Sequence, residues 1–88
     1  MTPADMTATI RRLLETHGRL GAKAAGLGAT QDLVAAGLTS FASVQLMLAL
    51  EEAFDIEFPE RMLNKRSFAS IVSIEACLRE IMPNQAAA

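Results

Sequence analysis

The hydrophobic pattern of the chain predicts helices and no strands. A first helix begins at Thr2-Pro3, because threonine caps helices and proline fits the first turn, and it ends at Gly18. Its apolar residues recur at helical spacing: Met6, Ile10, Leu13 and Leu14. Residues 20–30 are rich in glycine and alanine. They are predicted to form a loop, long enough for the next helix to run antiparallel to the first.

The connection to the centre of the chain carries apolar residues that we expect to pack inward: Leu20, Leu27, Leu33 and Val34. The last two belong to a short turn over residues 31–36, with Asp32 near its start. Gly37 then releases the chain into a central helix.

The central helix is a long unbroken run of helix-forming residues that starts at Thr39-Ser40. Both residue types suit the start, because a side-chain oxygen can accept one of the orphan N–H groups there. The predicted core face consists of Leu46, Met47, Leu50 and Phe54, and a second apolar face consists of Phe41, Val44 and Leu48. In so small a domain the second face favours contact with a partner. Burial of both faces is the alternative.

The remaining third of the chain predicts two more helices. Pro59 fits the first turn of a short helix over residues 60–63, and residues 64–67 break it. Ser70 caps the last helix, whose apolar residues are Ile71, Ile74, Leu78 and Ile81. We expect Glu75 to pair with Arg79, and Pro83 to end the helix. The fold class is therefore all-α, a small four-helix bundle of three main helices and one short one. It comprises one domain over residues 1–82 and a flexible tail over residues 83–88.

Composition narrows the function. A chain of 88 residues is one small domain without a large enclosed active site. Its single cysteine excludes an internal disulfide and a cysteine-based zinc site, and no other metal site is indicated. The net charge of −2 argues against a nucleic-acid partner. Residues 1–15 do not resemble a signal peptide and no apolar run approaches membrane-spanning length, so we expect a cytoplasmic protein without membrane contact. We also expect the protein to be a monomer.

The sequence around the central helix resembles the acyl carrier protein family. One matching segment is Gly37-Leu38-Thr39-Ser40-Phe41, and the other is Leu-Ala-Leu-Glu-Glu-Ala-Phe-Asp-Ile-Glu-Phe-Pro at 48–59. The usual family pattern is Asp-Ser-Leu, followed after the helix by Glu-Glu-x-Phe-x-Ile-x-x-Pro. Ser40 matches the serine, Phe41 takes the place of the leucine, and Thr39 replaces the aspartate. The resemblance covers residues 30–81.

Within that family the chain is most similar to the bacterial aminoacyl carrier proteins. This similarity rests on Ala-Gly-Leu-Thr-Ser-Phe-Ala-Ser-Val-Gln-Leu-Met at 36–47 and on Leu-Asn-Lys-Arg-Ser-Phe-Ala-Ser-Ile at 63–71. The resemblance implies that Ser40 carries 4′-phosphopantetheine, transferred from coenzyme A by a phosphopantetheinyl transferase. It also implies that the terminal thiol holds glycine or alanine as a thioester. The loading enzyme would be an amino acid:[carrier protein] ligase similar to seryl-tRNA synthetase, and a downstream enzyme would accept the cargo.

By this resemblance the chain is a carrier, without catalytic residues of its own, and not an enzyme. One alternative is a carrier of fatty-acyl, polyketide or peptidyl groups. Another is an unmodified helical adaptor that binds a partner through Phe41, Val44 and Leu48. Considered as a single serine, Ser40 would simply be a helix cap.

Thr39 is the main departure from the family pattern, because it removes a negative charge beside the attachment site. Ala42 and Gln45, predicted on the partner-facing half of the helix, are also neutral. Glu51 and Glu52 lie near the helix C-terminus, where the dipole disfavours acids. An acid placed there without local gain suggests a binding role, although solubility explains it equally well.

The predicted partner-binding residues are Thr39, Phe41, Val44, Gln45, Leu48, Glu51, Glu52, Met62 and Arg66. Arg61, Lys65 and Arg66 form a basic group that follows an acidic stretch. They can contact a partner or the phosphate of the prosthetic group, but a solvated face is the simpler interpretation. Met62 and Leu63 line the path of the arm or pack in the core. No chemistry is assigned to His17 or Cys77. We expect His17 at the surface or the core edge, and Cys77 as a small buried hydrophobic residue.

Overall fold

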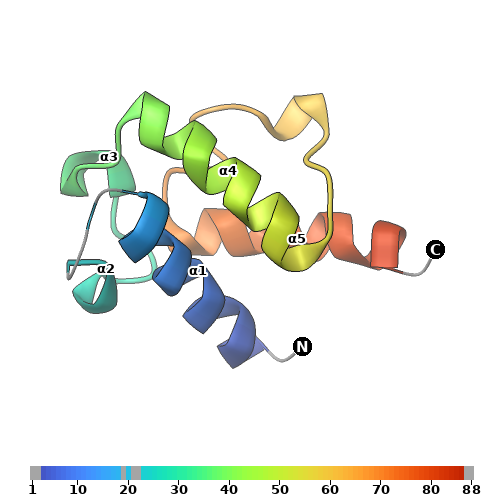
Figure 1. Ribbon diagram of the computed structural model, residues 1–88, viewed down its shortest axis with the longest axis horizontal. Coiled ribbons are helices and arrows are strands. Elements are labelled where there is room, and N and C mark those ends of the chain that lie inside the picture. The colour runs from blue at the N-terminus through green and yellow to red at the C-terminus, as the bar shows by residue number, and fades with distance from the viewer. Residues whose placement is uncertain (1–2, 19, 21–22, 87–88) are drawn as a thin grey trace.

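The computed structural model describes residues 3–18, 20 and 23–86, and these contain helices but no strand. The long helices are α1 (Pro3–His17), α4 (Ser40–Phe54) and α5 (Ile71–Ala86). The connections contain the short helices α2 (Lys23–Gly26) and α3 (Leu33–Ala36) and the 3₁₀ helix η1 (Glu60–Met62). Figure 1 shows α2 and α3 together at one end of the molecule, with the loop that carries η1 on the opposite side of α4 from α1. This arrangement confirms the predicted all-α fold.

One hydrophobic core joins the elements. Its fully buried large side chains are Ile10, Leu14, Leu33, Leu46, Leu50, Ile71, Ile74 and Leu78. Leu20 and Leu27 are buried as predicted, so the connection between α1 and α4 is anchored to the core. Phe58 and Phe68 are also buried in this core, and their ring centroids lie 5.5 Å apart. The helical spacing in the sequence therefore identified the core faces of all three long helices, except that Met47, predicted on the core face of α4, is only partly buried.

Three local predictions were wrong. The loop predicted over residues 20–30 contains α2. Val34 is 60% exposed, because α3 is a single turn and successive residues on a helix point about 100° apart, so only Leu33 faces the core. Pro83 does not end the last helix, since α5 continues to Ala86. A proline removes one backbone donor, which near a helix end leaves most of the hydrogen-bond ladder intact. The predicted cap Thr2 and the last residues of the predicted tail, 87–88, lie outside the described residues.

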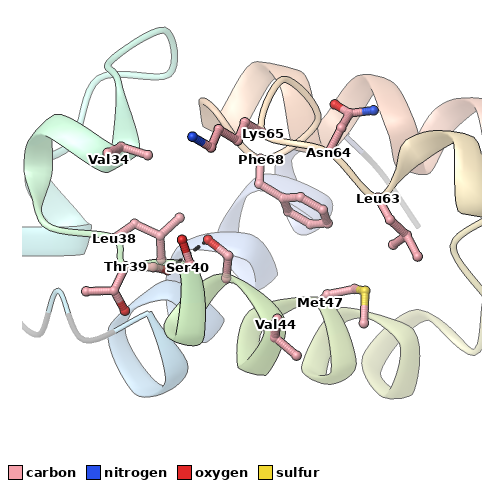
Figure 2. Close-up of a pocket in the computed structure, with 11 residues that line it drawn as sticks. Val34, Leu38, Thr39, Ser40, Val44, Met47, Leu63, Asn64, Lys65 and Phe68 are labelled. Carbon is pink, nitrogen blue, oxygen red and sulfur yellow. Dashed lines mark hydrogen bonds between the residues drawn. The ribbon is translucent and has the colours of Figure 1, made fainter.

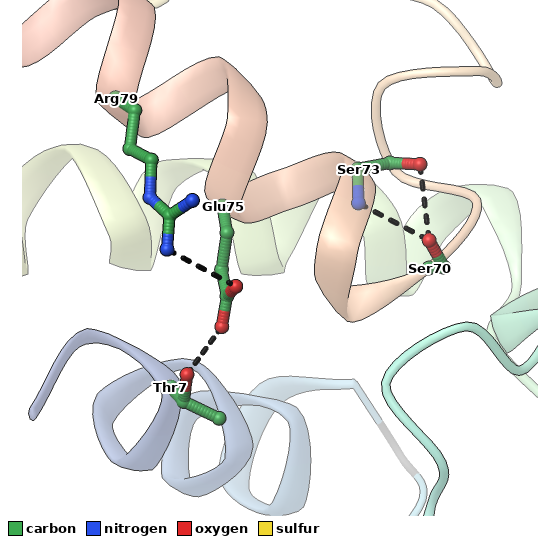
Figure 3. Close-up of polar contacts among 5 residues, drawn as sticks. All are labelled: Thr7, Ser70, Ser73, Glu75 and Arg79. Atoms are coloured by element: carbon green, nitrogen blue, oxygen red, sulfur yellow. Dashed lines mark hydrogen bonds and ion pairs between the residues drawn. The ribbon is translucent and has the colours of Figure 1, made fainter. Parts of the chain in front are cut away.

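Polar contacts tie the elements together (Figure 3). The hydroxyl of Thr7 on α1 donates to Glu75 on α5, and Glu75 also pairs with Arg79 at 3.9 Å. The Ser70 hydroxyl accepts the Ser73 N–H at 3.1 Å, which confirms Ser70 as the cap of α5. Arg11 of α1 reaches the connection that follows, and its guanidinium donates to the carbonyl oxygens of residues 24 and 27, at 3.2 and 2.6 Å. These contacts fix the segments that lead into and out of α4.

Candidate functional site

Two local motifs determine how the chain enters α4. Asp32 caps α3, because its Oδ1 accepts the N–H of Val34 at 2.9 Å. Gly37 then ends α3 with a φ of 122°, a left-handed conformation that glycine adopts without steric cost. The next residue, Leu38, is buried and anchors the turn in the core. The start of α4 is therefore held at a defined place on the surface.

At that start, Thr39 and not Ser40 caps the helix. The Thr39 hydroxyl oxygen accepts the N–H of Ala42 at 3.0 Å, and Thr39 has the extended backbone of a cap. Ser40 is the first residue of α4 and is exposed. Within the described part of the chain, its hydroxyl has no hydrogen-bond partner. The Ser40 hydroxyl is thus available for modification, and it lies at the positive end of the α4 dipole, which favours a phosphate.

A groove of about 520 Å³ opens beside Ser40 (Figure 2). One wall is α4, and the facing wall is the segment between η1 and α5. The lining residues are Val34 and Leu38 at the α3 end, Thr39, Ser40, Ser43, Val44 and Met47 on the α4 side, and Leu63, Asn64, Lys65 and Phe68 on the facing segment. Most of these side chains are apolar, so the groove suits a flexible chain with hydrocarbon portions attached at its edge.

The second apolar face of α4 is exposed, as the sequence predicted. Phe41, Val44 and Leu48 are 63%, 53% and 53% exposed. Val44 also lines the groove, so this face continues from the groove along the helix. Gln45 is exposed nearby. Ala42 was predicted on the same half of the helix, but it is fully buried because it lies one turn before Leu46 on the core face.

The two acids near the end of α4 have different environments. Glu51 is half-buried, and its Oε2 accepts the N–H of Phe58 at 2.9 Å. It therefore holds the chain where it turns back after α4, and the premise that this acid brings no local gain was wrong. Glu52 is exposed.

The remaining predicted site residues lie in η1 or directly after it, and their environments differ. Met62 is only 4% exposed and packs in the core, which corrects its prediction as a partner contact. Leu63 is exposed and lines the groove. Arg61 pairs with Glu80 at 3.0 Å, tying η1 to α5. Arg66 is exposed and lines a second hollow, with Asn64 and Lys65, that does not include Ser40.

Sequence reasoning left the facing wall of the groove largely unassigned. The sequence indicated Lys65 only as one of three cations, and it did not indicate Asn64 or Phe68 as site residues. No periodic signal exists in residues 63–70, which fold as irregular turns. The Asn64 side chain organises these turns by accepting the Ser67 N–H at 3.0 Å and by donating to the Arg61 carbonyl at 2.9 Å.

The described residues show neither a metal site nor a membrane-spanning helix. His17 and Cys77 are half-buried, and Cys77 packs against the core. Among the described residues, no three histidine, cysteine, aspartate or glutamate side chains come close enough to hold a metal ion. None of the described helices has the length and hydropathy needed to cross a membrane.

Comparison with known proteins agrees with this geometry. The chain matches the family model described as phosphopantetheine attachment site over residues 8–78, which includes the groove and all of α4. The chain belongs to this family. Membership means that 4′-phosphopantetheine is carried as a covalent group, which confirms the predicted cofactor.

Individual relatives are similar over nearly their full length. The aminoacyl carrier protein of Agrobacterium fabrum is 53% identical, across 94% of this chain and 100% of that protein. Two crystal structures show an engineered Bradyrhizobium japonicum glycine:[carrier protein] ligase in complex with a carrier protein from Agrobacterium tumefaciens, one with AMP and one with ATP. The matched chains are 55% identical, with TM-scores of 0.80 and 0.82, covering 83% and 86% of this chain and 97% and 99% of theirs.

A solution structure of an Agrobacterium tumefaciens protein matches with 52% identity and a TM-score of 0.73, covering 93% of this chain and 99% of that one. These similarities confirm the predicted resemblance to the aminoacyl carrier proteins and the predicted bundle.

Proposed function

We propose that Ser40 is the residue to which 4′-phosphopantetheine is attached. The observation that supports this proposal most strongly is the division of roles at the start of α4. Thr39 supplies the cap, so the Ser40 hydroxyl serves no structural purpose that modification would disrupt. A transferase can reach this hydroxyl because Ser40 is exposed.

The surroundings of Ser40 fit the group. A phosphodiester on Ser40 lies at the positive end of α4, which favours negative charge by roughly 0.3–1 kcal/mol. The adjoining groove has an apolar wall of Val44, Met47 and Leu63 that can shelter a hydrocarbon chain. When bound, the group supplies a thiol on a long flexible arm, to which an activated acid is joined as a thioester.

We further propose that the cargo is an amino acid, glycine or alanine, and that a seryl-tRNA-synthetase-like ligase loads it. The support is the 53% identity to an aminoacyl carrier protein and the 55% identity to chains in complexes of a glycine:[carrier protein] ligase. In this proposal the chain positions the arm and presents a docking face, while partner enzymes make and break the bonds.

The docking face proposed for these enzymes is the exposed side of α4. It comprises Phe41, Val44 and Leu48, flanked by Thr39, Gln45 and Glu52. An exposed apolar strip of this kind gains free energy when a partner covers it, because about 25 cal/mol is gained per Å² of apolar area removed from water. Arg66, which is exposed and lies outside the groove, is a further proposed contact.

Intact-mass measurement tests the attachment. The chain is co-expressed with a phosphopantetheinyl transferase, together with Ser40→Ala and the control Ser43→Ala. Ser43 is a suitable control because it lies one turn away and its hydroxyl donates to the Thr39 carbonyl at 3.0 Å. We expect the mass of phosphopantetheine on the wild type and on Ser43→Ala, and none on Ser40→Ala. An unmodified wild type, or a modified Ser40→Ala, contradicts the proposal.

A loading assay on the modified protein tests the cargo. Glycine and alanine are offered with ATP and amino acid:[carrier protein] ligases, and fatty acids are offered with acyl-activating enzymes. Loading of an amino acid supports the aminoacyl carrier. Loading of fatty acids alone shows a carrier of the fatty-acyl type instead.

A further inference from the structure

The three cations after η1 have three different environments. Arg61 is engaged by Glu80 at 3.0 Å. Arg66 faces a hollow that excludes Ser40. Lys65 lines this hollow as well, but it also lines the groove that contains Ser40, and no carboxylate among the described residues pairs with it. Of these two neighbouring cations, Lys65 therefore lies on the groove and Arg66 lies outside it.

Lys65 is the only charged residue among the described residues that line the groove. Figure 2 shows its side chain extending from the facing wall toward the side where Ser40, Leu38 and Val34 lie. The rest of the lining is apolar or carries neutral polar groups. A positive charge at this place complements a negative charge brought to the groove.

We propose that the Lys65 ammonium group pairs with the phosphodiester on Ser40 and thereby directs the prosthetic arm into the groove between α4 and residues 63–68. The inference rests on the proposed attachment at Ser40. In it, Lys65 is a positioning residue, which acts through the orientation of the arm and not through the reacting thiol.

The physical basis is the combination of two attractions at the same phosphate. The start of α4 attracts negative charge from one side, and the lysine does so from the other wall of the groove. Lysine suits this role because its ammonium is a compact charge on a flexible four-carbon stem that can follow a mobile phosphate. Once the phosphate is held between the walls, the branched hydrocarbon portion of pantetheine that follows it lies against Val44, Met47 and Leu63. The apolar lining alone favours contact with the hydrocarbon portion, and Lys65 adds an attraction for the phosphate at the entrance to that lining.

The test compares methyl NMR spectra of the unmodified and modified proteins, with intact mass confirming that each sample carries the arm. The probes are the methyl groups of Val44, Met47 and Leu63. The variants are Lys65→Met, which removes the charge and keeps the length, Lys65→Arg, which keeps the charge, and the matched control Arg66→Met. Both positions, 65 and 66, are exposed, so the fold is expected to be retained in all variants.

We expect attachment to shift the groove methyl signals in the wild type, in Lys65→Arg and in Arg66→Met. In Lys65→Met we expect these shifts to fall at least two-fold. Raising the salt concentration from about 0.1 M to 1 M shortens the Debye length from about 10 to 3 Å, so the wild-type shifts should fall toward those of Lys65→Met without any substitution.

Equal shifts in Lys65→Met and the wild type overturn the inference, as does an equal loss in Arg66→Met, which would mean that general charge and not position 65 matters. Failure of the proposed attachment is distinguishable, because it appears in the mass spectrum as an unmodified wild type. A modified protein whose groove signals do not depend on Lys65 refutes only the role of Lys65.

Discussion

At the start of α4, two adjacent hydroxyl residues perform different tasks. Thr39 satisfies the helix by accepting the Ala42 N–H, and this leaves the Ser40 hydroxyl exposed. Threonine can do this in place of the family's aspartate because both side chains offer an oxygen acceptor at a cap. The substitution therefore keeps the local structure and removes only the negative charge.

Replacing Thr39 or Ser40 by alanine, one at a time, should show that Thr39 contributes to stability and that Ser40 does not. Thr39→Ala removes the cap and should lower the free energy of unfolding by about 1 kcal/mol. Ser40→Ala changes an exposed helical position to a good helix former and should change it by less than about 0.5 kcal/mol. Urea unfolding measures both, with Thr39→Ser as the control that keeps the cap. A larger loss in Ser40→Ala than in Thr39→Ala would show that Ser40 has a structural role.

At the level of single residues, the sequence predicted which residue is the candidate for modification better than it predicted which residues contact one another. It identified Ser40 as the candidate because its residue type and neighbours matched a motif. It did not distinguish which hydroxyl caps the helix, since both types can. It misplaced Met62 and the role of Glu51, because their environments depend on where the chain returns after α4. Contacts of this kind join segments that no local pattern relates.

At the scale of the element, α4 shows how one helix serves a core and a partner. Leu46 and Leu50 are fully buried, while Val44 and Leu48 on another face are 53% exposed. The apolar period in the sequence revealed both faces, but only the packing of α4 against α1 and the rest of the core shows which one is covered. The exposed strip begins beside Ser40, so a partner that covers it is brought to the attachment site.

Substitution on the two faces should have opposite consequences. Val44→Ala or Leu48→Ala should lower kcat/KM for ligase loading several-fold and change the melting temperature little, because both side chains are exposed. The control Leu46→Ala deletes a buried side chain and should cost about 2–5 kcal/mol of stability. Thermal unfolding and loading rates on the modified proteins check this. Parallel losses of stability and loading in Val44→Ala would place Val44 in the core.

The connection between α1 and α4 depends on a contact that the sequence did not indicate. The Arg11 guanidinium donates to two carbonyl oxygens of that connection. Hydrogen bonds to a charged group contribute about 1.5–3 kcal/mol, so Arg11→Met should destabilise the protein by about that amount. Arg12→Met is the matched control, since the Arg12 residue is exposed. Denaturant unfolding measures the difference, and equal stability of the two variants would show that the connection does not need Arg11.

For the whole molecule, the sequence predicted the architecture because the three long helices have strong apolar periods. It did not predict α2 and α3 as helices, because helices of 4 residues carry no readable period and form only when tertiary contacts hold them. One such contact is the backbone hydrogen bond in which the Leu33 N–H donates to the Ala69 carbonyl oxygen at 2.8 Å. It joins the segment before α4 to the segment before α5. The groove lies between α4 and the segment before α5, so its shape follows from the assembled fold.

The assembled fold also predicts what attachment does to stability. The core beneath Ser40 is filled by side chains such as Leu38 and Leu46, and the space beside Ser40 is an open groove. An arm in that groove stays on the surface. The modified protein should therefore exceed the unmodified one in free energy of unfolding by only about 0.3–1 kcal/mol from the helix dipole, with a similar amount at most from a surface ion pair. Both contributions are electrostatic, so the difference should largely disappear in 1 M salt. Urea unfolding of both forms at low and high salt measures this. A gain of several kcal/mol that persists at high salt would mean that the arm is buried within the bundle.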